Sequence, residues 1–135
     1  MSDERMAFSL SFPAQAEYLV LCRLAVTALG RLAPLGEELV DDLKLAVTEA
    51  CTNVVQHAYP DSAPGRIELT YEAQAGLVRI TIEDTGVGHA HERLQALGDR
   101  EGGMGLAIIR SLVDEVELEP GPGGRGTRVS LAKSL

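Results

Sequence analysis

The sequence has few cysteines and no long apolar run, and both shortages narrow the classes of protein that it can encode. Its 135 residues include two cysteines, Cys22 and Cys51, with no CxxC pair and no paired histidine. A disulfide or a zinc site is therefore not expected, and both thiols are predicted to be buried. No apolar run approaches the roughly 20 residues that span a membrane, and the N-terminus lacks a basic region followed by an apolar stretch. We therefore expect a cytoplasmic protein.

Basic residues are also scarce. The chain has 12 Lys and Arg against 20 Asp and Glu, which gives a formal net charge of −8. This balance argues against direct binding to nucleic acid or to anionic membranes. The pattern G-x-x-x-x-G-K-[ST] is absent, which excludes a P-loop, and no Ser-His-Asp or Cys-His arrangement stands out. The 45% hydrophobic and 24% charged fractions are those of a folded chain, and the length predicts a single domain over residues 1–135.

Hydrophobic periodicity predicts the element order β-α-α-ββ-loop-α-ββ. Alternating apolar residues predict strands near residues 6–12, 66–73, 77–82, 116–118 and 128–131. Apolar residues spaced by three and four predict helices near residues 14–32, 37–57 and 104–113. Gln74-Ala75-Gly76 joins two strands as a hairpin, and Pro13 suits the first turn of a helix. The aperiodic segment 85–103 is predicted to be a functional or mobile loop. The economical packing is a two-layer α/β sandwich, with helices on one face of a mostly antiparallel mixed sheet.

The predicted helix over residues 37–57 carries a polar stripe. Glu49, Asn53 and His57 are spaced by four residues, so they lie along one edge of its apolar face. A carboxylate and a carboxamide one turn apart, half sheltered by the core, can hold a divalent cation and a water or hydroxyl. Taken alone, a Glu and an Asn at this spacing usually form a solvated helix edge. A lone histidine near an apolar face is more often a packed, hydrogen-bonded core residue than a ligand.

Two glycine clusters downstream favour the functional interpretation. Asp84-Thr85-Gly86-Val87-Gly88 places a carboxylate at a strand end, where it can accept a hydrogen bond from the exocyclic amine of adenine. Gly102-Gly103-Met104-Gly105-Leu106 opens a helix, and amides at a helix N-terminus can bind phosphate. Each cluster is also typical of an ordinary turn or loop. Together with the polar stripe, the two clusters predict an ATP site.

These residues resemble the small serine-kinase anti-sigma factors of bacteria, within the GHKL ATP-binding superfamily. Residues 49–59 match the family's E-A-x-x-N-x-x-x-H-A-Y box, residues 84–88 its D-x-G-x-G box and residues 100–106 its G-x-G-L box. Gly126-Thr127 resembles the short Gly-Thr that closes the adenine pocket. The likeness covers nearly the whole chain, so it implies the GHKL fold as well as ATP and Mg²⁺ as cofactors.

The resemblance implies a role for each matching residue. Glu49 is implied as the general base, Asn53 as the Mg²⁺ ligand and Asp84 as the residue that binds the adenine amine. The other implied nucleotide contacts are Gly86, Gly88, Arg100, Gly103, Met104, Gly105, Leu106 and Thr127. Among these contacts, Arg100 is implied to reach the γ-phosphate. His57 lies in the same box as Glu49 and Asn53, and the resemblance gives it a structural role.

The resemblance also implies partner switching. A protein of this kind holds a sigma factor away from RNA polymerase and phosphorylates a serine or threonine of a small anti-anti-sigma protein of the STAS type. Arg23 matches an arginine of the first helix that family members present to partners, and homodimers form through the N-terminal strand and helix. One alternative is an ATP-binding module that captures a partner without phosphoryl transfer, but the presence of Glu49 favours a kinase. A histidine-kinase catalytic domain or a purely hydrolytic ATPase would need additional domains, for which we expect no room.

Overall fold

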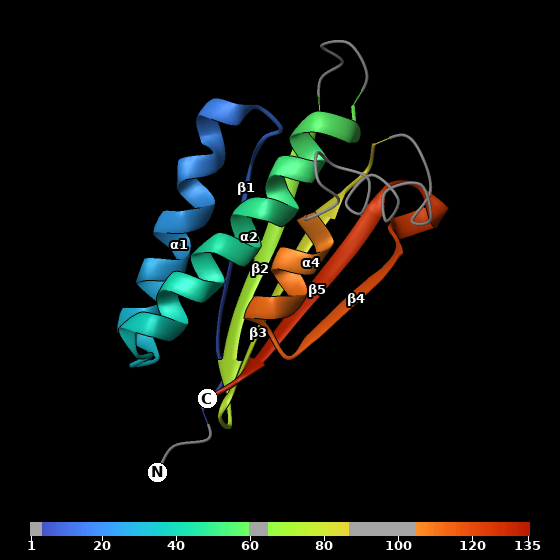
Figure 1. The fold of residues 1–135 in the computed structure, drawn as a ribbon. Helices are drawn as coiled ribbons and strands as arrows, with labels where there is room; N and C mark the ends of the chain where they lie inside the picture. Colours follow the sequence, from blue (N-terminus) through green and yellow to red (C-terminus); the bar gives the residue numbers. More distant parts are fainter. Residues whose placement is uncertain (1–3, 60–64, 87–104) are drawn as a thin grey trace.

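A computed structural model of the protein describes residues 4–59, 65–86 and 105–135 (Figure 1). Its strands are β1 (Met6–Pro13), β2 (Arg66–Gln74), β3 (Leu77–Asp84), β4 (Glu115–Pro120) and β5 (Thr127–Ser134). Its helices are α1 (Leu19–Leu32), α2 (Glu37–His57) and α4 (Gly105–Leu112), with short 3₁₀ turns η1 (Ala16–Tyr18) and η3 (Pro122–Gly124). The described elements follow one another in the predicted order.

The strands form one five-stranded sheet in the order β1-β2-β3-β5-β4. Each pair of neighbouring strands runs antiparallel. Helices α1, α2 and α4 all cover the same face of the sheet, as Figure 1 shows. The predicted two-layer α/β sandwich is therefore confirmed. The expected mixed character is not seen in the described strands, whose neighbours all pair in the antiparallel sense.

The core lies between the sheet and the apolar side of α2. Alternate residues of β2 and β3 turn toward the helices and are buried, namely Ile67, Leu69, Tyr71, Val78, Ile80 and Ile82. From α2 the same core receives Leu43, Val47, Ala50 and Val54. Fully burying a side chain of this size contributes about 1.5–3 kcal/mol, so this layer fixes α2 on the sheet. Glu37 and Glu38 in the first turn of α2 also complement the helix dipole.

Helices α1 and α2 pack against each other at a glycine. A Cβ added at Gly30 would lie 2.6 Å from Cγ2 of Val40, so only glycine permits this close approach. Farther along the same pair of helices, Cys22 and Cys51 are both fully buried and free of any disulfide, as predicted. None of the described helices combines the length and the apolar character needed to cross a membrane.

The N-terminal part of the fold differs from the sequence prediction in one detail. Pro13 is the last residue of β1, where it pairs with Arg66, and the α-helix begins only at Leu19 after the turn η1. The prediction that Pro13 starts a helix is therefore wrong. Because β1 lies at the edge of the sheet, its final residue needs no amide hydrogen to satisfy a strand on both sides, and proline is accepted there.

Candidate functional site

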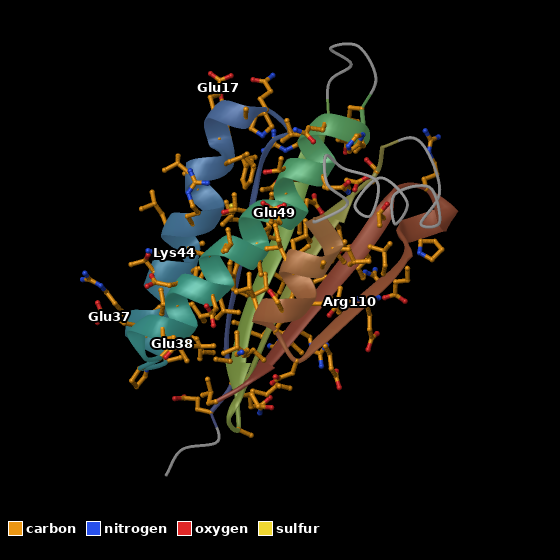
Figure 2. All side chains as sticks on the ribbon, in the orientation of Figure 1. Glu17, Glu37, Glu38, Lys44, Glu49 and Arg110 are labelled. Carbon is orange, nitrogen blue, oxygen red and sulfur yellow. The ribbon has the colours of Figure 1, made fainter. Side chains whose placement is uncertain are left out.

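The polar stripe of α2 runs from the middle of the helix to its last turn. Glu49 is half-buried, Asn53 is buried and His57 is exposed. Figure 2 places Glu49 midway along the helix, well away from the acidic residues of its first turn. The expectation of a packed core histidine is wrong for His57, whose side chain is exposed although the next residue, Ala58, is buried. Glu49 and Asn53 are therefore the sheltered part of the polar stripe.

Asn53 carries a buried oxygen without a hydrogen-bond partner. Its side chain is only 1% exposed, and its amide oxygen Oδ1 has no partner among the described residues. Leaving such an atom unpaired costs about 1–3 kcal/mol, which a bound ligand can recover. The described residues contain no group of three or more His, Cys, Asp or Glu that could hold a metal ion. A carboxamide oxygen is a hard ligand of the kind that Mg²⁺ accepts, so the unpaired Oδ1 of Asn53 fits such an ion.

Asp84 ends β3 as a buried carboxylate that is 3% exposed. Its Oδ1 accepts a hydrogen bond from the main-chain N–H of Gly86 at 3.0 Å, which fixes the orientation of the carboxylate. Thr127, the first residue of β5, is its cross-strand partner. The hydroxyl of Thr127 is also buried with no partner in the described part of the chain. A carboxylate and a hydroxyl thus lie together at one end of the sheet, where they can bind a donor-bearing base.

Glycines let the main chain close tightly around Asp84. A Cβ at Gly126 would overlap the carbonyl group of Asp84, and Gly126 also has a φ of 68°, which other residues rarely adopt. A Cβ at Gly86 would overlap the carbonyl group of Ala58, the residue that follows α2. Gly86 therefore brings the turn after Asp84 against the end of the helix that carries Asn53. This contact joins the two halves of the predicted site.

The phosphate side of the predicted site is described only in part. Gly105 is buried as the first residue of α4, Leu106 is half-buried, and α4 packs against α2. Gly88, Arg100, Gly103 and Met104 lie outside the described residues, as does most of the predicted loop.

Arg23 lies apart from the other predicted residues, on the seam between α1 and α2. Its side chain is half-buried, and its Nη1 lies 3.5 Å from Oγ1 of Thr48. The same two helices also carry exposed apolar side chains, namely Val20, Leu24 and Leu45. This position agrees with a contact to another protein and separates Arg23 from the nucleotide residues.

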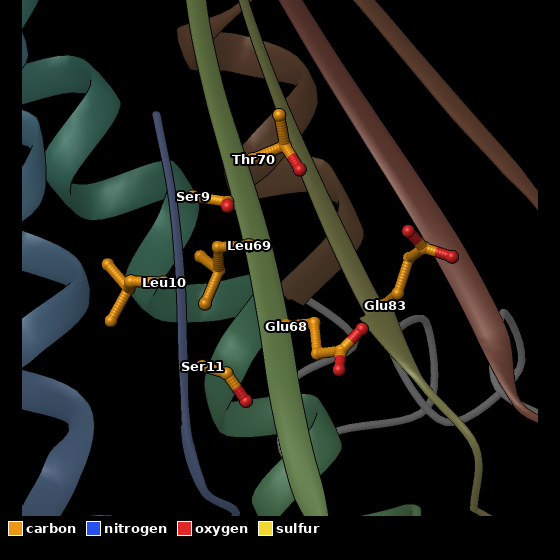
Figure 3. Close-up of a pocket in the computed structure, with 7 residues that line it drawn as sticks. All are labelled: Ser9, Leu10, Ser11, Glu68, Leu69, Thr70 and Glu83. Carbon is orange, nitrogen blue, oxygen red and sulfur yellow. The ribbon is translucent and has the colours of Figure 1, made fainter. Parts of the chain in front are cut away.

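A depression of about 380 Å³ lies elsewhere, on the face of the sheet opposite the helices (Figure 3). It is lined by Ser9, Leu10, Ser11, Glu68, Leu69, Thr70 and Glu83, none of which belongs to the predicted site. Glu68 and Glu83 are cross-strand partners there. Glu83 is also paired with Arg128 at 3.2 Å, and the depression contains none of the residues that the motifs assign to the nucleotide.

The fold is that of a histidine kinase-like ATPase domain. The family model of that domain matches residues 12–133, which include every predicted site residue. The matched range contains both buried polar residues described above, Asn53 on α2 and Asp84 at the end of β3.

Comparison with curated relatives identifies the family within this class of domain. The serine-protein kinase RsbW of Staphylococcus epidermidis is 38% identical over 128 residues, which cover 86% of this chain and 80% of that protein. The serine-protein kinase RsbW of Listeria innocua is 34% identical over 121 residues, which cover 82% and 77%. The chain belongs to the RsbW family of serine-protein kinases.

Solved structures agree on the fold. The structure of the RsbU and RsbW domains of a Mycobacterium tuberculosis protein matches 96% of this chain with a TM-score of 0.68 and 20% identity, and the chain spans 32% of it. The histidine kinase domain of a blue-light activated kinase from Erythrobacter litoralis matches 92% of this chain with a TM-score of 0.57 and 29% identity. The chain spans 62% of that structure.

Sequence reasoning assigned no separate role to two positions that the structure brings into the site. Tyr59 contacts the main chain that follows Asp84, although the sequence offered only its place at the end of the E-A-x-x-N-x-x-x-H-A-Y box. Gly121 packs against the carbonyl group of Arg125, and a Cβ there would also lie 3.2 Å from the carbonyl oxygen of Asp84. In the sequence, Gly121 was marked only by its place in a glycine-rich turn.

Proposed function

We propose that the chain is an ATP-dependent serine/threonine protein kinase and an anti-sigma factor, formed by a single domain over residues 1–135. It sequesters a sigma factor and phosphorylates an anti-anti-sigma antagonist of the STAS type. The observation that carries the proposal is the unpaired buried oxygen of Asn53, one helical turn from the half-buried carboxylate of Glu49. A ligand oxygen and a candidate base on one rigid helix are the parts that phosphoryl transfer requires.

In this proposal Glu49 is the general base. Being half-buried, it is sheltered enough to act on a bound hydroxyl and open enough for a serine of another protein to reach it. Asn53 would hold Mg²⁺ through its unpaired Oδ1, and the bound ion would neutralise charge on the phosphates. Because α2 is fixed by the core, the two side chains keep a constant spacing. Positioning and charge neutralisation supply most of the rate in such reactions.

The adenine end of the nucleotide is proposed to lie at the end of β3. Asp84 accepts a hydrogen bond from the adenine amine, Thr127 offers its buried hydroxyl beside it, and Gly86 forms the floor. The phosphates are proposed to meet Gly88, Arg100, Gly103, Met104, Gly105 and Leu106. The phosphate contacts are supported by the G-x-G-L box and by the position of Gly105 at the N-terminus of α4.

Arg23 is proposed to contact the protein partners. Its 3.5 Å approach to Thr48 is at the outer limit for a hydrogen bond, so the guanidinium can turn to a partner carboxylate at little cost. We also propose a homodimer through β1 and α1, which is consistent with the position of β1 at the edge of the sheet. A sigma factor as partner places the protein in the cytoplasm.

The proposal is tested by incubating the protein with γ-labelled ATP, Mg²⁺ and a candidate STAS-type antagonist. Label on a serine or threonine of the antagonist supports the kinase. The alternative is an ATP-binding module that captures its partner without phosphoryl transfer. Capture of the antagonist in the presence of ATP, with no transfer of label over many turnover times, would favour that module.

A further inference from the structure

Tyr59 follows α2 and ties three segments of the chain together. Its phenol oxygen accepts a hydrogen bond from the main-chain N–H of Thr85 at 3.1 Å. The same hydroxyl donates a hydrogen bond to the main-chain carbonyl oxygen of Arg66 at 2.8 Å. One hydroxyl therefore connects the end of α2 with the residue after β3 and with the first residue of β2.

The ring of Tyr59 is packed as closely as its hydroxyl is bonded. A Cβ added at Gly65 would overlap the ring, so the ring lies directly against the main chain before β2. The preceding residue, Ala58, is fully buried, and its carbonyl group lies directly against Gly86. The end of α2 therefore contacts the turn after Asp84 at two consecutive positions.

These contacts bear on the distance between the two halves of the proposed nucleotide site. Asp84 immediately precedes Thr85, whose N–H is held by Tyr59. Asn53 lies on the helix that ends just before Tyr59. Any movement of the Asp84 turn relative to α2 must break the bond between the Tyr59 hydroxyl and Thr85.

We propose that Tyr59 is a positioning residue for nucleotide binding, whose hydroxyl holds the Asp84 carboxylate in place for the adenine amine without touching the nucleotide. The inference rests on the proposed function, because it needs Asp84 to bind adenine. It assigns a task to the tyrosine of the E-A-x-x-N-x-x-x-H-A-Y box, beyond the catalytic and metal-binding roles of Glu49 and Asn53.

The test is the Tyr59→Phe variant, which keeps the ring and removes the hydroxyl. ATP affinity should fall by about 3- to 10-fold, the effect of losing one or two hydrogen bonds that hold the site. In the Asp84→Asn background the same substitution should change ATP affinity by less than about 2-fold, because the bond that Tyr59 positions has already been lost. Calorimetric titration of the wild type, both single variants and the double variant gives this cycle.

A matched control separates positioning from stability. Tyr71 also hydrogen-bonds a main-chain carbonyl, that of Cys22 at 3.1 Å, but it does so in the core beneath α1. Tyr71→Phe should lower the melting temperature and leave ATP affinity unchanged. Equal losses of ATP affinity from Tyr59→Phe with and without Asp84→Asn would overturn the positioning role.

The two proposals fail in different ways. A wild-type chain that does not bind ATP overturns the nucleotide site and the role of Tyr59 together. A wild type that binds ATP, an Asp84→Asn variant that binds it weakly and a Tyr59→Phe variant that binds it normally overturn only the role of Tyr59.

Discussion

At the scale of single residues, the site is marked by polar groups that the fold buries without pairing. The amide oxygen of Asn53 and the hydroxyl of Thr127 have no hydrogen-bond partner among the described residues, although both side chains are only 1% exposed. Buried polar groups are usually bonded, so each of these atoms needs an explanation. The proposed nucleotide with Mg²⁺ would supply one for both, because it would bring donors, acceptors and a cation to these two atoms.

Asp84 gives the first prediction at this scale. The Gly86 N–H bonds Oδ1, so in an Asp84→Asn variant the amide oxygen should keep that bond and turn its NH₂ group toward the adenine amine. Two donors then face each other. ATP affinity should fall by roughly 1–3 kcal/mol, the range for a buried charged hydrogen bond left unmade. Calorimetry measures this change.

Asp114→Asn is the control for that substitution. Asp114 accepts a hydrogen bond from the main-chain N–H of Ser134 at 2.6 Å, on an exposed part of the surface beyond α4. Its replacement should leave ATP binding unaltered. If Asp84→Asn binds ATP as tightly as the wild type, Asp84 does not contact adenine.

At the scale of elements, the hairpin between β2 and β3 offers a test of local strain. Its two loop residues, Ala75 and Gly76, have φ values of 50° and 78°. Both lie in the left-handed region that two-residue hairpins of this type require, and alanine is poorly accepted there. Ala75→Asn should therefore raise the free energy of unfolding by about 0.5–1 kcal/mol. Urea denaturation followed by circular dichroism measures it, and an unchanged or lower midpoint would contradict the assignment of strain.

The packing of α1 against α2 leads to a prediction about the reactivity of the two thiols. A hydrogen bond with Cys22, followed by burial, raises the pKa of the Cys51 thiol, and both side chains are fully buried. The same hydrogen bond lowers the pKa of the Cys22 thiol, so burial and not protonation protects that sulfur. Because the reagent must reach a thiolate, neither buried cysteine should react with Ellman's reagent within minutes at pH 8 in native buffer. Both should react at once in denaturant. Rapid native reaction would show that the two helices separate readily.

Periodicity predicted those elements whose apolar pattern is uninterrupted. It placed α2 at residues 37–57, because Leu43, Val47, Ala50 and Val54 repeat along one face until the chain reaches Pro60. It misplaced the start of α1, because the edge position that lets Pro13 end a strand depends on the order of strands in the sheet.

Sequence motifs supplied the residues of the proposed site, but they did not predict how those residues are arranged. Glu49 and Asn53 lie one turn apart, which spacing alone reveals. The hydrogen bond between Tyr59 and Thr85 joins residues 26 positions apart in the chain, and only the packed fold brings them together. The same holds for Gly86 and Ala58.

At the scale of the whole molecule, the sheet order explains why the site lies where it does. β3 is the middle strand, with β5 beside it, so the end of β3 and the start of β5 place Asp84 and Thr127 together. α2 lies over the same sheet, and its end meets that corner through Ala58 and Tyr59. The site therefore draws on both layers of the sandwich, whereas Arg23 lies on the outer side of the helical layer.

The central claim is that the polar stripe of α2 performs phosphoryl transfer. Its most direct test is single-turnover phosphorylation of the antagonist by the Glu49→Gln variant, beside an ATP titration of the same protein. Glutamine keeps the shape of the side chain but cannot accept the proton of the attacking hydroxyl. Glu38→Gln, in the first turn of the same helix, is the matched control and should transfer phosphate at the wild-type rate.

The transfer rate of Glu49→Gln should fall by about 10²–10⁴, the usual contribution of a general base. ATP affinity and capture of the antagonist should stay unchanged, since neither depends on that proton. A Glu49→Gln variant that phosphorylates the antagonist at close to the wild-type rate would contradict the claim and remove Glu49 as the base.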